Sequence, residues 1–258
     1  MIQDAGVASA GQAGRMAESE LVDYDRVADL YKVGRAMPDE ALDRWGRAVR
    51  PHLPAGGRVR VADVGAGTGI FAASWPAWGA SGVVAVEVSA AMAAHGRGVA
   101  PYVRGVAEAL PLAAGSVEVV WLSTAFHHFA DKAAAVAEID RVLAPGGVVL
   151  IRTFLAERAR QSYFRLYPGI EKALRLCPDV AWFAGWFGPA GFMVRQVEDL
   201  RDVETTYRKA ADWVERMRHA DSMLTALTDD EVATGVRRLR ETPDETAVLD
   251  LSLVVLRR

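Results

Sequence analysis

The sequence holds a single cysteine among its 258 residues, and basic residues are not in excess. Cys177 by itself can neither close a disulfide within the chain nor build a cysteine-based zinc site, and such cysteine usage is typical of a reducing compartment. The 30 Lys and Arg residues stand against 33 Asp and Glu residues, which gives a net charge of −3. Binding to a nucleic-acid backbone usually requires a basic excess, so we expect no nucleic-acid partner.

Targeting signals and long apolar runs are scarce as well. Residues 1–16 are small and polar and lack the basic start and apolar centre of a secretory signal, so we expect a disordered tail there and a cytoplasmic protein. The longest uncharged apolar stretch, residues 180–194, contains three glycines and a proline and is shorter than the roughly 20 residues of a membrane-spanning helix. We therefore expect no membrane partner, and no residue pattern indicates a metal site.

Short Val-rich runs alternate with Ala-rich stretches through the middle of the chain. This alternation is typical of an α/β fold in which helices cover both faces of a parallel sheet. Strands are predicted over residues 58–64, 82–87, 101–104, 117–123, 147–154, 192–197 and 247–256. We expect a core over residues 56–258, a helical cover over 17–55, and lid-forming insertions at about 155–190 and 200–242.

Several helices carry clear boundary signals. Apolar residues at helical spacing predict two helices between residues 18 and 49. Asp131 has the position of an N-cap for a helix that ends before Pro145-Gly146-Gly147, and the stretch from Thr228 to Glu231 matches a capping box. A further helix is predicted over about 157–176.

The most informative segment is a buried strand that runs into a glycine-rich turn and then a helix, Asp63-x-Gly65-x-Gly67-x-Gly69. Glycine lets the backbone turn tightly and lets a ligand approach main-chain N–H groups that a Cβ would block. The dinucleotide fingerprint places its third glycine one residue later, which disfavours a nicotinamide oxidoreductase. The acid two residues before Gly65 suits a cationic ammonium or sulfonium ligand better than a pyrophosphate. The alternative is a turn that serves packing only.

Glu87 ends the next predicted strand, 22 residues after Gly65. A carboxylate about 20 residues beyond the turn, at the carboxyl end of the second strand, can accept hydrogen bonds from both hydroxyls of a ribose. No arginine lies beside it in the sequence to take a 2′-phosphate, so the pattern favours a ribose without that group. An exposed acid without a ligand is the alternative at this position.

With four further motifs, this turn resembles the class I S-adenosylmethionine-dependent methyltransferases, in the branch that includes ubiquinone and menaquinone C-methyltransferases and natural-product methyltransferases. The motifs are Glu87-x-Ser89-x-x-Met92, Gly105-x-Ala107-Glu108-x-Leu110-Pro111, Phe126-His127-His128-Phe129 and Arg141-Val142-Leu143-x-Pro145-Gly146-Gly147. They occur within residues 61–152 in the family's order and spacing. The resemblance implies a doubly wound, Rossmann-like sheet of seven mostly parallel strands with an antiparallel final strand. It also implies S-adenosylmethionine as cofactor and S-adenosylhomocysteine as product.

The resemblance assigns contacts to that cofactor. It implies that Asp63 and the glycine turn lie along the methionine part, that Glu87 binds the ribose, and that Ala107 and Glu108 border the adenine. The helix before the core closes over the cofactor in similar enzymes, where Arg35 could meet a carboxylate. The expected cofactor residues are Asp63, Gly65, Ala66, Gly67, Gly69, Glu87, Val88, Met92, Val106, Ala107, Glu108, Ser123, Tyr24, Tyr31 and Arg35.

His127 and His128 follow the fourth strand, where the methyl acceptor is expected to lie. Either imidazole could act as general base toward a hydroxyl, because histidine titrates near neutrality. Adjacent residues do not share one face of a helix, so at most one is expected to point at the acceptor. The alternative is that both pack or cap a short helix. The preceding residues lack the Asn/Asp-Pro-Pro-aromatic signature of resembling enzymes that methylate DNA adenine or glutamine.

Eight of the 21 aromatic residues crowd into residues 156–192. They form either the wall of a pocket for an apolar acceptor or a core that cements the extra helices to the sheet. Arg152 ends the fifth strand, and ligands of open α/β sheets bind at the carboxyl ends of strands. The expected acceptor residues are Arg152, Tyr163, Tyr167, Trp182 and Trp186.

The sequence thus predicts an enzyme that transfers a methyl group from S-adenosylmethionine to oxygen, nitrogen or carbon of a small, hydrophobic metabolite. The expected assembly is a monomer or a homodimer. Two alternatives stay open: a cofactor-binding enzyme that catalyses a rearrangement or cyclisation, and a noncatalytic binding protein of the same fold.

Overall fold

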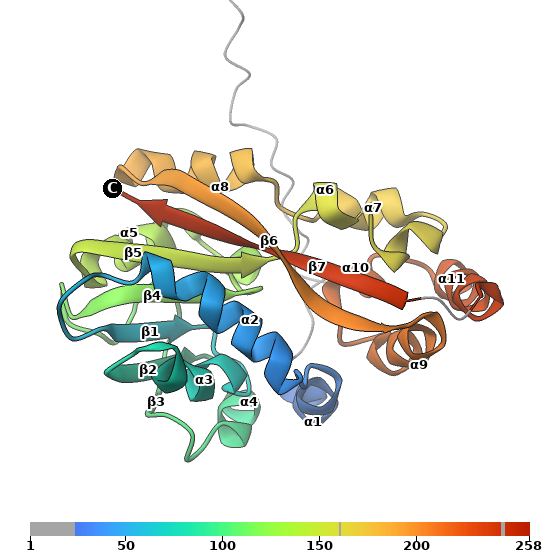
Figure 1. The fold of residues 1–258 in the computed structure, drawn as a ribbon, viewed down its shortest axis with the longest axis horizontal. Coiled ribbons are helices and arrows are strands. Elements are labelled where there is room, and N and C mark those ends of the chain that lie inside the picture. The colour runs from blue at the N-terminus through green and yellow to red at the C-terminus, as the bar shows by residue number, and fades with distance from the viewer. Residues whose placement is uncertain (1–23, 160, 244–245) are drawn as a thin grey trace, which may run out of the picture.

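A single seven-stranded sheet runs through the molecule in the order β3-β2-β1-β4-β5-β7-β6 (Figure 1). The computed structural model describes residues 24–159, 161–243 and 246–258, so the tail expected over residues 1–16 lies outside the described residues. The strands are β1 Arg60–Val64, β2 Gly82–Glu87, β3 Tyr102–Arg104, β4 Val117–Ser123, β5 Leu143–Thr153, β6 Met193–Thr206 and β7 Thr246–Arg257. The first five strands pair in parallel, and β7 runs antiparallel to both β5 and β6. The predicted Rossmann-like sheet with an antiparallel final strand is confirmed.

Helices pack on both faces of this sheet because successive strand residues point to opposite sides. Val119 and Trp121 of β4 join one buried cluster with residues of α2 and α3, whereas Val120 and Leu122 join a second cluster with residues of α5 and α8. The α-helices are α1 Tyr24–Gly34, α2 Asp39–Val49, α3 Ile70–Trp78, α4 Ala90–His95, α5 Lys132–Val142, α6 Ala156–Ala159, α7 Ile170–Leu174, α8 Val180–Phe187, α9 Tyr207–Met217, α10 Ser222–Thr225 and α11 Asp229–Glu241. Short 3-10 helices are η2 Arg50–His52, η3 Phe126–His128, η4 Tyr163–Leu166 and η5 Gly188–Ala190. No helix within the described ranges has both the length and the apolar character needed to cross a membrane.

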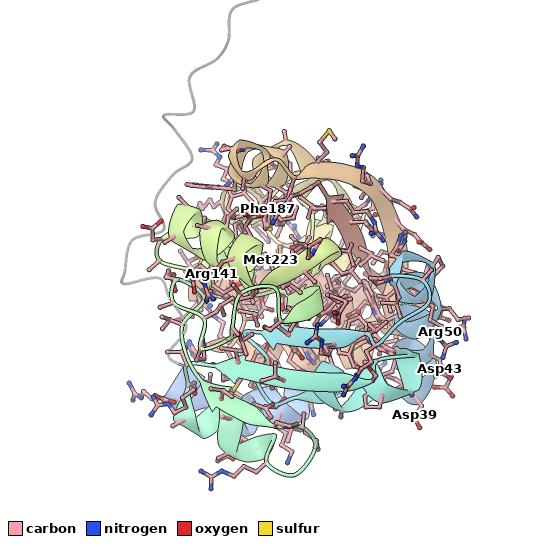
Figure 2. The ribbon with its side chains drawn as sticks, turned by 90° about the vertical axis from the view of Figure 1, so that its left-hand side faces the viewer. Asp39, Asp43, Arg50, Arg141, Phe187 and Met223 are labelled. Carbon is pink, nitrogen blue, oxygen red and sulfur yellow. The ribbon has the colours of Figure 1, made fainter. Side chains whose placement is uncertain are left out.

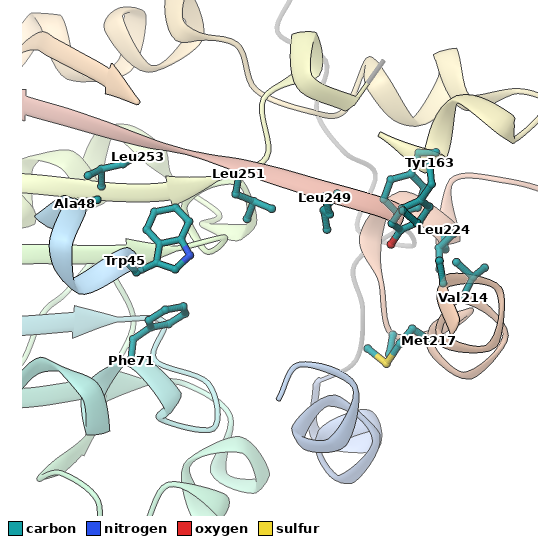
Figure 3. Close-up of a cluster of buried hydrophobic side chains, with 14 of the residues drawn as sticks. Trp45, Ala48, Phe71, Tyr163, Val214, Met217, Leu224, Leu249, Leu251 and Leu253 are labelled. Atoms are coloured by element: carbon teal, nitrogen blue, oxygen red, sulfur yellow. The ribbon is translucent and has the colours of Figure 1, made fainter. Parts of the chain in front are cut away.

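The helix α2 is amphipathic, and its apolar side fixes it to the sheet. Trp45 is fully buried and meets Trp121 edge to face, with ring centroids 6.2 Å apart. The Phe71 ring of α3 lies near Trp45 (Figure 3), and both rings contact Trp121 of β4. Asp39 and Asp43, on the opposite side, point outward into solvent (Figure 2). The division between the two sides follows the helical period of the sequence, as predicted.

Strand β6 is much longer than the predicted strand over 192–197. It spans 14 residues and pairs with β7 along nearly its whole length, from Met193 opposite Arg257 to Thr206 opposite Thr246. As an edge strand it carries charged side chains such as Glu198 and Glu204, which protect the edge from further pairing and hide the strand pattern in the sequence. The second expected insertion therefore begins after Thr206 and not at residue 200.

The β6–β7 hairpin extends past the other strands and carries α9, α10 and α11 at its far end (Figure 1). Buried residues of the hairpin and these helices join η4 in one core, where Leu249 of β7, Val214 and Met217 of α9, Leu224 of α10 and Tyr163 lie together (Figure 3). This helical layer sits at the carboxyl edge of the parallel strands, because β7 enters the sheet from that edge.

Two of the predicted helix starts are confirmed, and one predicted helix is wrong. Asp131 caps α5, since its side chain accepts from the Ala134 amide at 3.0 Å, and the capping box at Thr228 and Glu231 is present at the start of α11. The helix predicted over 157–176 is wrong: the segment breaks into α6, η4 and α7. Pro168 precedes Gly169, whose φ of +74° places it in the left-handed region and interrupts any continuous helix.

Candidate functional site

Three adjoining cavities lie at the carboxyl edge of the sheet. The turn cavity, about 460 Å³, extends from the glycine-rich turn to α9. The strand cavity, about 250 Å³, lies at the end of β2, and the histidine cavity, about 80 Å³, lies against η3. Tyr31 of α1 and Thr124, directly after β4, line all three cavities. The cavities therefore meet around these two residues.

The glycine-rich turn forms one wall of both larger cavities. Gly65 and Gly67 line both, with φ values of +72° and +56°, and the Gly65 amide donates to the Val86 carbonyl of β2. A Cβ on Gly65 would lie 2.7 Å from the Cβ of Ala125, so this position leaves no room for a side chain. The turn thus brings main chain up to the cavity, as the sequence predicts.

Gly69 has a different role from the one expected. It lines none of the three cavities, and a Cβ there would lie 2.3 Å from the hydroxyl of Tyr102. Its φ of +83° starts α3, and its missing side chain lets Tyr102 pack closely. Gly69 therefore shapes the turn without facing a ligand.

Asp63 is a buried acid at the wall of the turn cavity. Asp63 is only 1% exposed, and neither carboxylate oxygen makes a well-formed hydrogen bond within the described residues; the Ala72 amide of α3 lies close enough to stabilise the charged form only in part. Burial, together with the nearby Glu87 carboxylate, raises the pKa of Asp63 to about 8. A cationic group in the turn cavity would supply the missing partner and favour the ionised carboxylate.

Glu87 is held at the junction of the turn and the strand cavity. One carboxylate oxygen accepts from the Gly67 amide at 2.7 Å, and the other accepts from the Ser89 amide at 2.8 Å. A carboxylate has about four lone-pair positions, so each oxygen retains capacity for one more donor. This arrangement fits a carboxylate fixed in place to receive two hydroxyl groups.

Most of the other expected cofactor residues border the same space. Those that line the strand cavity are Val88, Met92, Val106, Ala107, Glu108 and Ser123, whereas Ala66 and Arg35 line the turn cavity. The Glu108 carboxylate accepts from the amides of Ala130 and Asp131, so it anchors the start of the α5 region. Tyr24 begins α1, and its side chain lies outside the described part of the structure.

Arg35 meets a carboxylate, and that carboxylate belongs to the protein. Its guanidinium donates to Asp221 at 2.6 Å and lies 5.5 Å from the ring centroids of both Tyr31 and Trp213. The indole of Trp213 in turn donates to the Gly34 carbonyl at 2.7 Å. These contacts tie the end of α1 to α9 and to the cap of α10, over the place where the turn and histidine cavities meet.

Both histidines line the histidine cavity, contrary to the expectation that only one would face it. In the tight turn of η3 the two rings lie side by side, with centroids 3.9 Å apart and planes tilted by 45°. Burial lowers the pKa of His128 to about 4, with Lys132 adding to the effect, and burial with the adjacent His128 lowers the pKa of His127 well below its usual value. Both imidazoles are therefore neutral near pH 7.

The expected acceptor residues divide into two groups. Arg152 and Tyr163 line the turn cavity, whereas Tyr167, Trp182 and Trp186 line none of the three. The ring of Tyr167 packs against Gly235 of α11, where a Cβ would lie only 2.2 Å away. Trp182 lies on the other face of the sheet, 5.4 Å from the ring of Phe126, and Trp186 packs next to it. These three residues pack the added helices against the rest of the protein and do not form a wall of the cavities, which was the second alternative in the sequence.

The Arg152 guanidinium is hydrogen-bonded to other side chains of the protein. Its guanidinium makes two hydrogen bonds to Asp202, at 3.0 and 2.5 Å, and a third to the hydroxyl of Ser123 at 3.1 Å. Asp202 also accepts from the indole of Trp45 at 2.8 Å. Arg152 therefore fixes the ends of β4 and β5 relative to β6 and contributes a neutralised charge to the cavity wall.

Several cavity residues carry no signal in the sequence that marks them as part of a site. Thr124 is the sole non-glycine residue with positive φ in the described ranges, at +49°, and its amide donates to the Arg152 carbonyl. Such backbone strain often marks functional sites, but no residue pattern signals it. Trp213, Asp221 and Met223 reach the histidine cavity from α9 and α10, far along the chain.

The cavities fit the cofactor expected from the resemblance. The partnerless Asp63 suits a cationic amino acid moiety, the anchored Glu87 suits a ribose, and the apolar Met92 and Ala107 suit an adenine ring. Residues 62–151 also match the family model of the methyltransferase domain.

Known proteins with similar sequences are also methyltransferases. The demethylmenaquinone methyltransferase of Beutenbergia cavernae is 33% identical over 194 residues, which cover 66% of this chain and 80% of that protein. The malonyl-acyl-carrier-protein O-methyltransferase of Enterobacter lignolyticus is 35% identical over 144 residues, or 53% of this chain and 56% of that protein. The chain thus spans only about half the length of the latter relative.

Solved structures share the fold. The 4+2 cyclase SpnF superposes with a TM-score of 0.63 at 21% identity, covering 91% of this chain and 94% of that one. A methyltransferase from Bacillus halodurans gives a TM-score of 0.59 at 19% identity, covering 82% and 97%. Likeness at this level of identity concerns the fold alone. With the sequence relatives and the site geometry, the chain belongs to the S-adenosylmethionine-dependent methyltransferases, and S-adenosylmethionine is its cofactor.

Proposed function

We propose that the methyl acceptor is a small, mainly apolar molecule that places a hydroxyl group in the histidine cavity. The observation that carries this proposal is the lining of that cavity, where two neutral imidazoles face apolar side chains. The apolar lining residues include Phe154, Phe164, Leu176, Leu249 and Leu251. A neutral imidazole can accept a hydrogen bond from an acceptor hydroxyl and take its proton as the methyl group is transferred, and on this basis we propose oxygen as the methylated atom.

The residues of the site divide the work of the reaction. When bound, S-adenosylmethionine supplies a methyl group that its sulfonium makes electrophilic. Asp63 would pair with the cationic end of its methionine part, and Glu87 would accept hydrogen bonds from the ribose. His127 or His128 would hold the acceptor hydroxyl and take its proton. The apolar wall excludes water and limits the orientations of the acceptor, which is the main catalytic requirement of methyl transfer.

The names of the relatives support an oxygen acceptor as one chemistry of the family. One relative is named as an O-methyltransferase acting on malonyl-acyl-carrier protein, and the other is named for demethylmenaquinone. The acceptors differ, so the acceptor of this chain has to be found by experiment.

Transfer of isotope from methyl-labelled S-adenosylmethionine into a panel of phenols, carboxylic acids and amines tests the proposal directly. We expect label in methyl ethers or esters, with equimolar S-adenosylhomocysteine. Label found only on nitrogen or carbon would contradict the oxygen assignment. An acceptor that changes structure while label stays on the cofactor would indicate a rearrangement or cyclisation instead.

The ribose role of Glu87 gives a binding prediction. Glu87→Gln keeps the shape of the side chain but removes the charge that strengthens hydrogen bonds to hydroxyls, so the Kd for S-adenosylhomocysteine is expected to rise roughly 10-fold or more in calorimetric titration. Glu118→Gln is the matched control, because Glu118 is the second residue of β4 and pairs with Arg60 at the amino ends of the two strands, away from the cavities. Equal affinity in the Glu87→Gln variant and the wild type would show that Glu87 does not hold the ribose.

Burial of the neutral His128 predicts acid-sensitive stability. The pKa of His128 is about 4 in the folded protein and near 6.5 when exposed, so the unfolded chain binds an extra proton between these values. The stability that this residue contributes is therefore complete above about pH 6.5 and is lost as pH falls toward 4. In urea unfolding from pH 7 to pH 4.5, His128→Gln is expected to lose less stability than the wild type. Parallel pH curves for the two proteins would contradict the neutral, buried imidazole.

A further inference from the structure

The turn cavity continues past the cofactor residues to a polar mouth on α9. Lys209, Asp212, Trp213 and Arg216 all line the cavity. They follow one another at intervals of three, one and three residues, which places them on one face of the helix. Lys209 and Arg216 are exposed, and Trp213 lies between them, half-buried. The mouth thus carries two cations, one on each side of an aromatic ring.

These two cations differ from the other charged residues of the same cavity. Arg35 is paired with Asp221, Arg152 with Asp202, and Asp212 with Arg240. Within the described residues, neither Lys209 nor Arg216 forms an ion pair. The remaining acid of the cavity, Asp63, is buried at the opposite end, beside the glycine turn. The mouth on α9 therefore carries two cations that have no ion-pair partner among the described residues, next to Asp212, which is paired with Arg240.

The mouth is continuous with the histidine cavity. Tyr31, Arg35, Thr124, Trp213 and Leu249 line both cavities. The histidine cavity is the smallest of the three, at about 80 Å³ against about 460 Å³ for the turn cavity. An acceptor whose reacting end enters the histidine cavity can extend its remainder past Trp213 and Leu249, toward Lys209 and Arg216.

We propose that the acceptor is an amphipathic anion, with its apolar body along Trp213 and Leu249 and its carboxylate, sulfonate or phosphate group at Lys209 and Arg216. This inference rests on the proposed function, because it assumes that the acceptor occupies the histidine cavity. The two cations select the acceptor and lie outside the reacting groups. They are expected to affect acceptor binding and to leave cofactor binding unchanged.

Two fluorescent probes that differ by a single charged group test this assignment. The anion 8-anilinonaphthalene-1-sulfonate and the neutral N-phenyl-1-naphthylamine share the same apolar rings. With the protein saturated with S-adenosylhomocysteine, the anion is expected to bind about 10-fold more tightly, as two partly exposed ion pairs allow. In the double variant Lys209→Gln with Arg216→Gln, the two probes are expected to bind equally.

The control variant removes the same charge from elsewhere. Arg208→Gln with Arg237→Gln also removes two exposed cations, but neither residue lines the turn cavity. This control is expected to retain the preference for the anion. Equal binding of the two probes to the wild type, or loss of the preference in the control, would overturn the proposal.

Two further readouts separate this inference from the proposed function. If the Lys209/Arg216 variant weakens S-adenosylhomocysteine binding tenfold, the cations serve the cofactor and the inference is wrong, although methyl transfer to oxygen stands. If the variant behaves as expected but labelled methyl groups appear on nitrogen or carbon, the anionic mouth stands and the oxygen assignment fails.

Discussion

Replacing Gly67 by valine is expected to raise the Kd for S-adenosylhomocysteine at least about 100-fold, a loss near 2.7 kcal/mol. Gly67 lines both the turn and strand cavities, and its amide holds the Glu87 carboxylate at 2.7 Å. A Cβ there points at Met92, 3.3 Å from its Cε, so the added methyl groups would occupy space at the ribose end of the site. The φ of +56° also disfavours a β-branched residue, which would disturb the turn that positions Glu87.

Backbone strain alone has to be separated from loss of the binding surface. Gly115 has a φ of +62°, nothing lies within 4 Å of a Cβ placed there, and it lines none of the three cavities. Gly115→Val is therefore expected to lower the free energy of unfolding by about 1–3 kcal/mol, as backbone strain alone would in Gly67→Val. Its affinity for S-adenosylhomocysteine is expected to stay at the wild-type value. Calorimetric titration of both variants measures the difference. Equal affinities would show that the glycine turn does not contact the cofactor.

Replacing Asp202 by alanine is expected to destabilise the fold by about 3–5 kcal/mol, because it leaves the Arg152 guanidinium buried without its partner. The Arg152 and Asp202 side chains are 7% and 5% exposed. The variant also removes the acceptor of the Trp45 indole. Thermal unfolding is expected to shift downward by roughly 6–20 °C, at about 2–4 °C per kcal/mol for a domain of this size.

An exposed ion pair on the same hairpin gives the comparison. Arg201 donates to Asp250 at 2.6 Å, with both side chains more than one third exposed, so Asp250→Ala is expected to cost at most about 1 kcal/mol. Combining Asp202→Leu with Arg152→Met removes both buried charges and is expected to recover most of the stability. If Asp202→Ala is as mild as Asp250→Ala, the pair is hydrated and does not anchor β5 to β6.

The cofactor half of the site was the more predictable half. The glycine turn, Asp63 and Glu87 lie within 25 residues, and each depends on local backbone conformation or on the end of a single strand. Gly69 was predicted as a cofactor residue because a glycine that makes room for Tyr102 and a glycine that makes room for a ligand look the same in the sequence.

The residues around the expected methyl acceptor were less predictable, because side-chain packing decides which of them line the cavities. Tyr163 and Tyr167 are four residues apart, yet Tyr163 lines the turn cavity and Tyr167 packs against Gly235. Trp182 and Trp186 belong to the same aromatic run but cover the opposite face of the sheet. Composition reveals the aromatic cluster, but the direction of each ring depends on neighbours from distant elements.

The sequence by itself determined the parallel strands, the glycine-rich turn and the acid at the end of β2, because hydrophobic period, glycine conformation and strand ends are local properties. The tertiary structure decided what surrounds the acceptor. Arg35 meets Asp221 across 186 residues and Arg152 meets Asp202 across 50. Such contacts form only when the hairpin and its helices fold back over the sheet, since long-range packing and not local preference brings these side chains together.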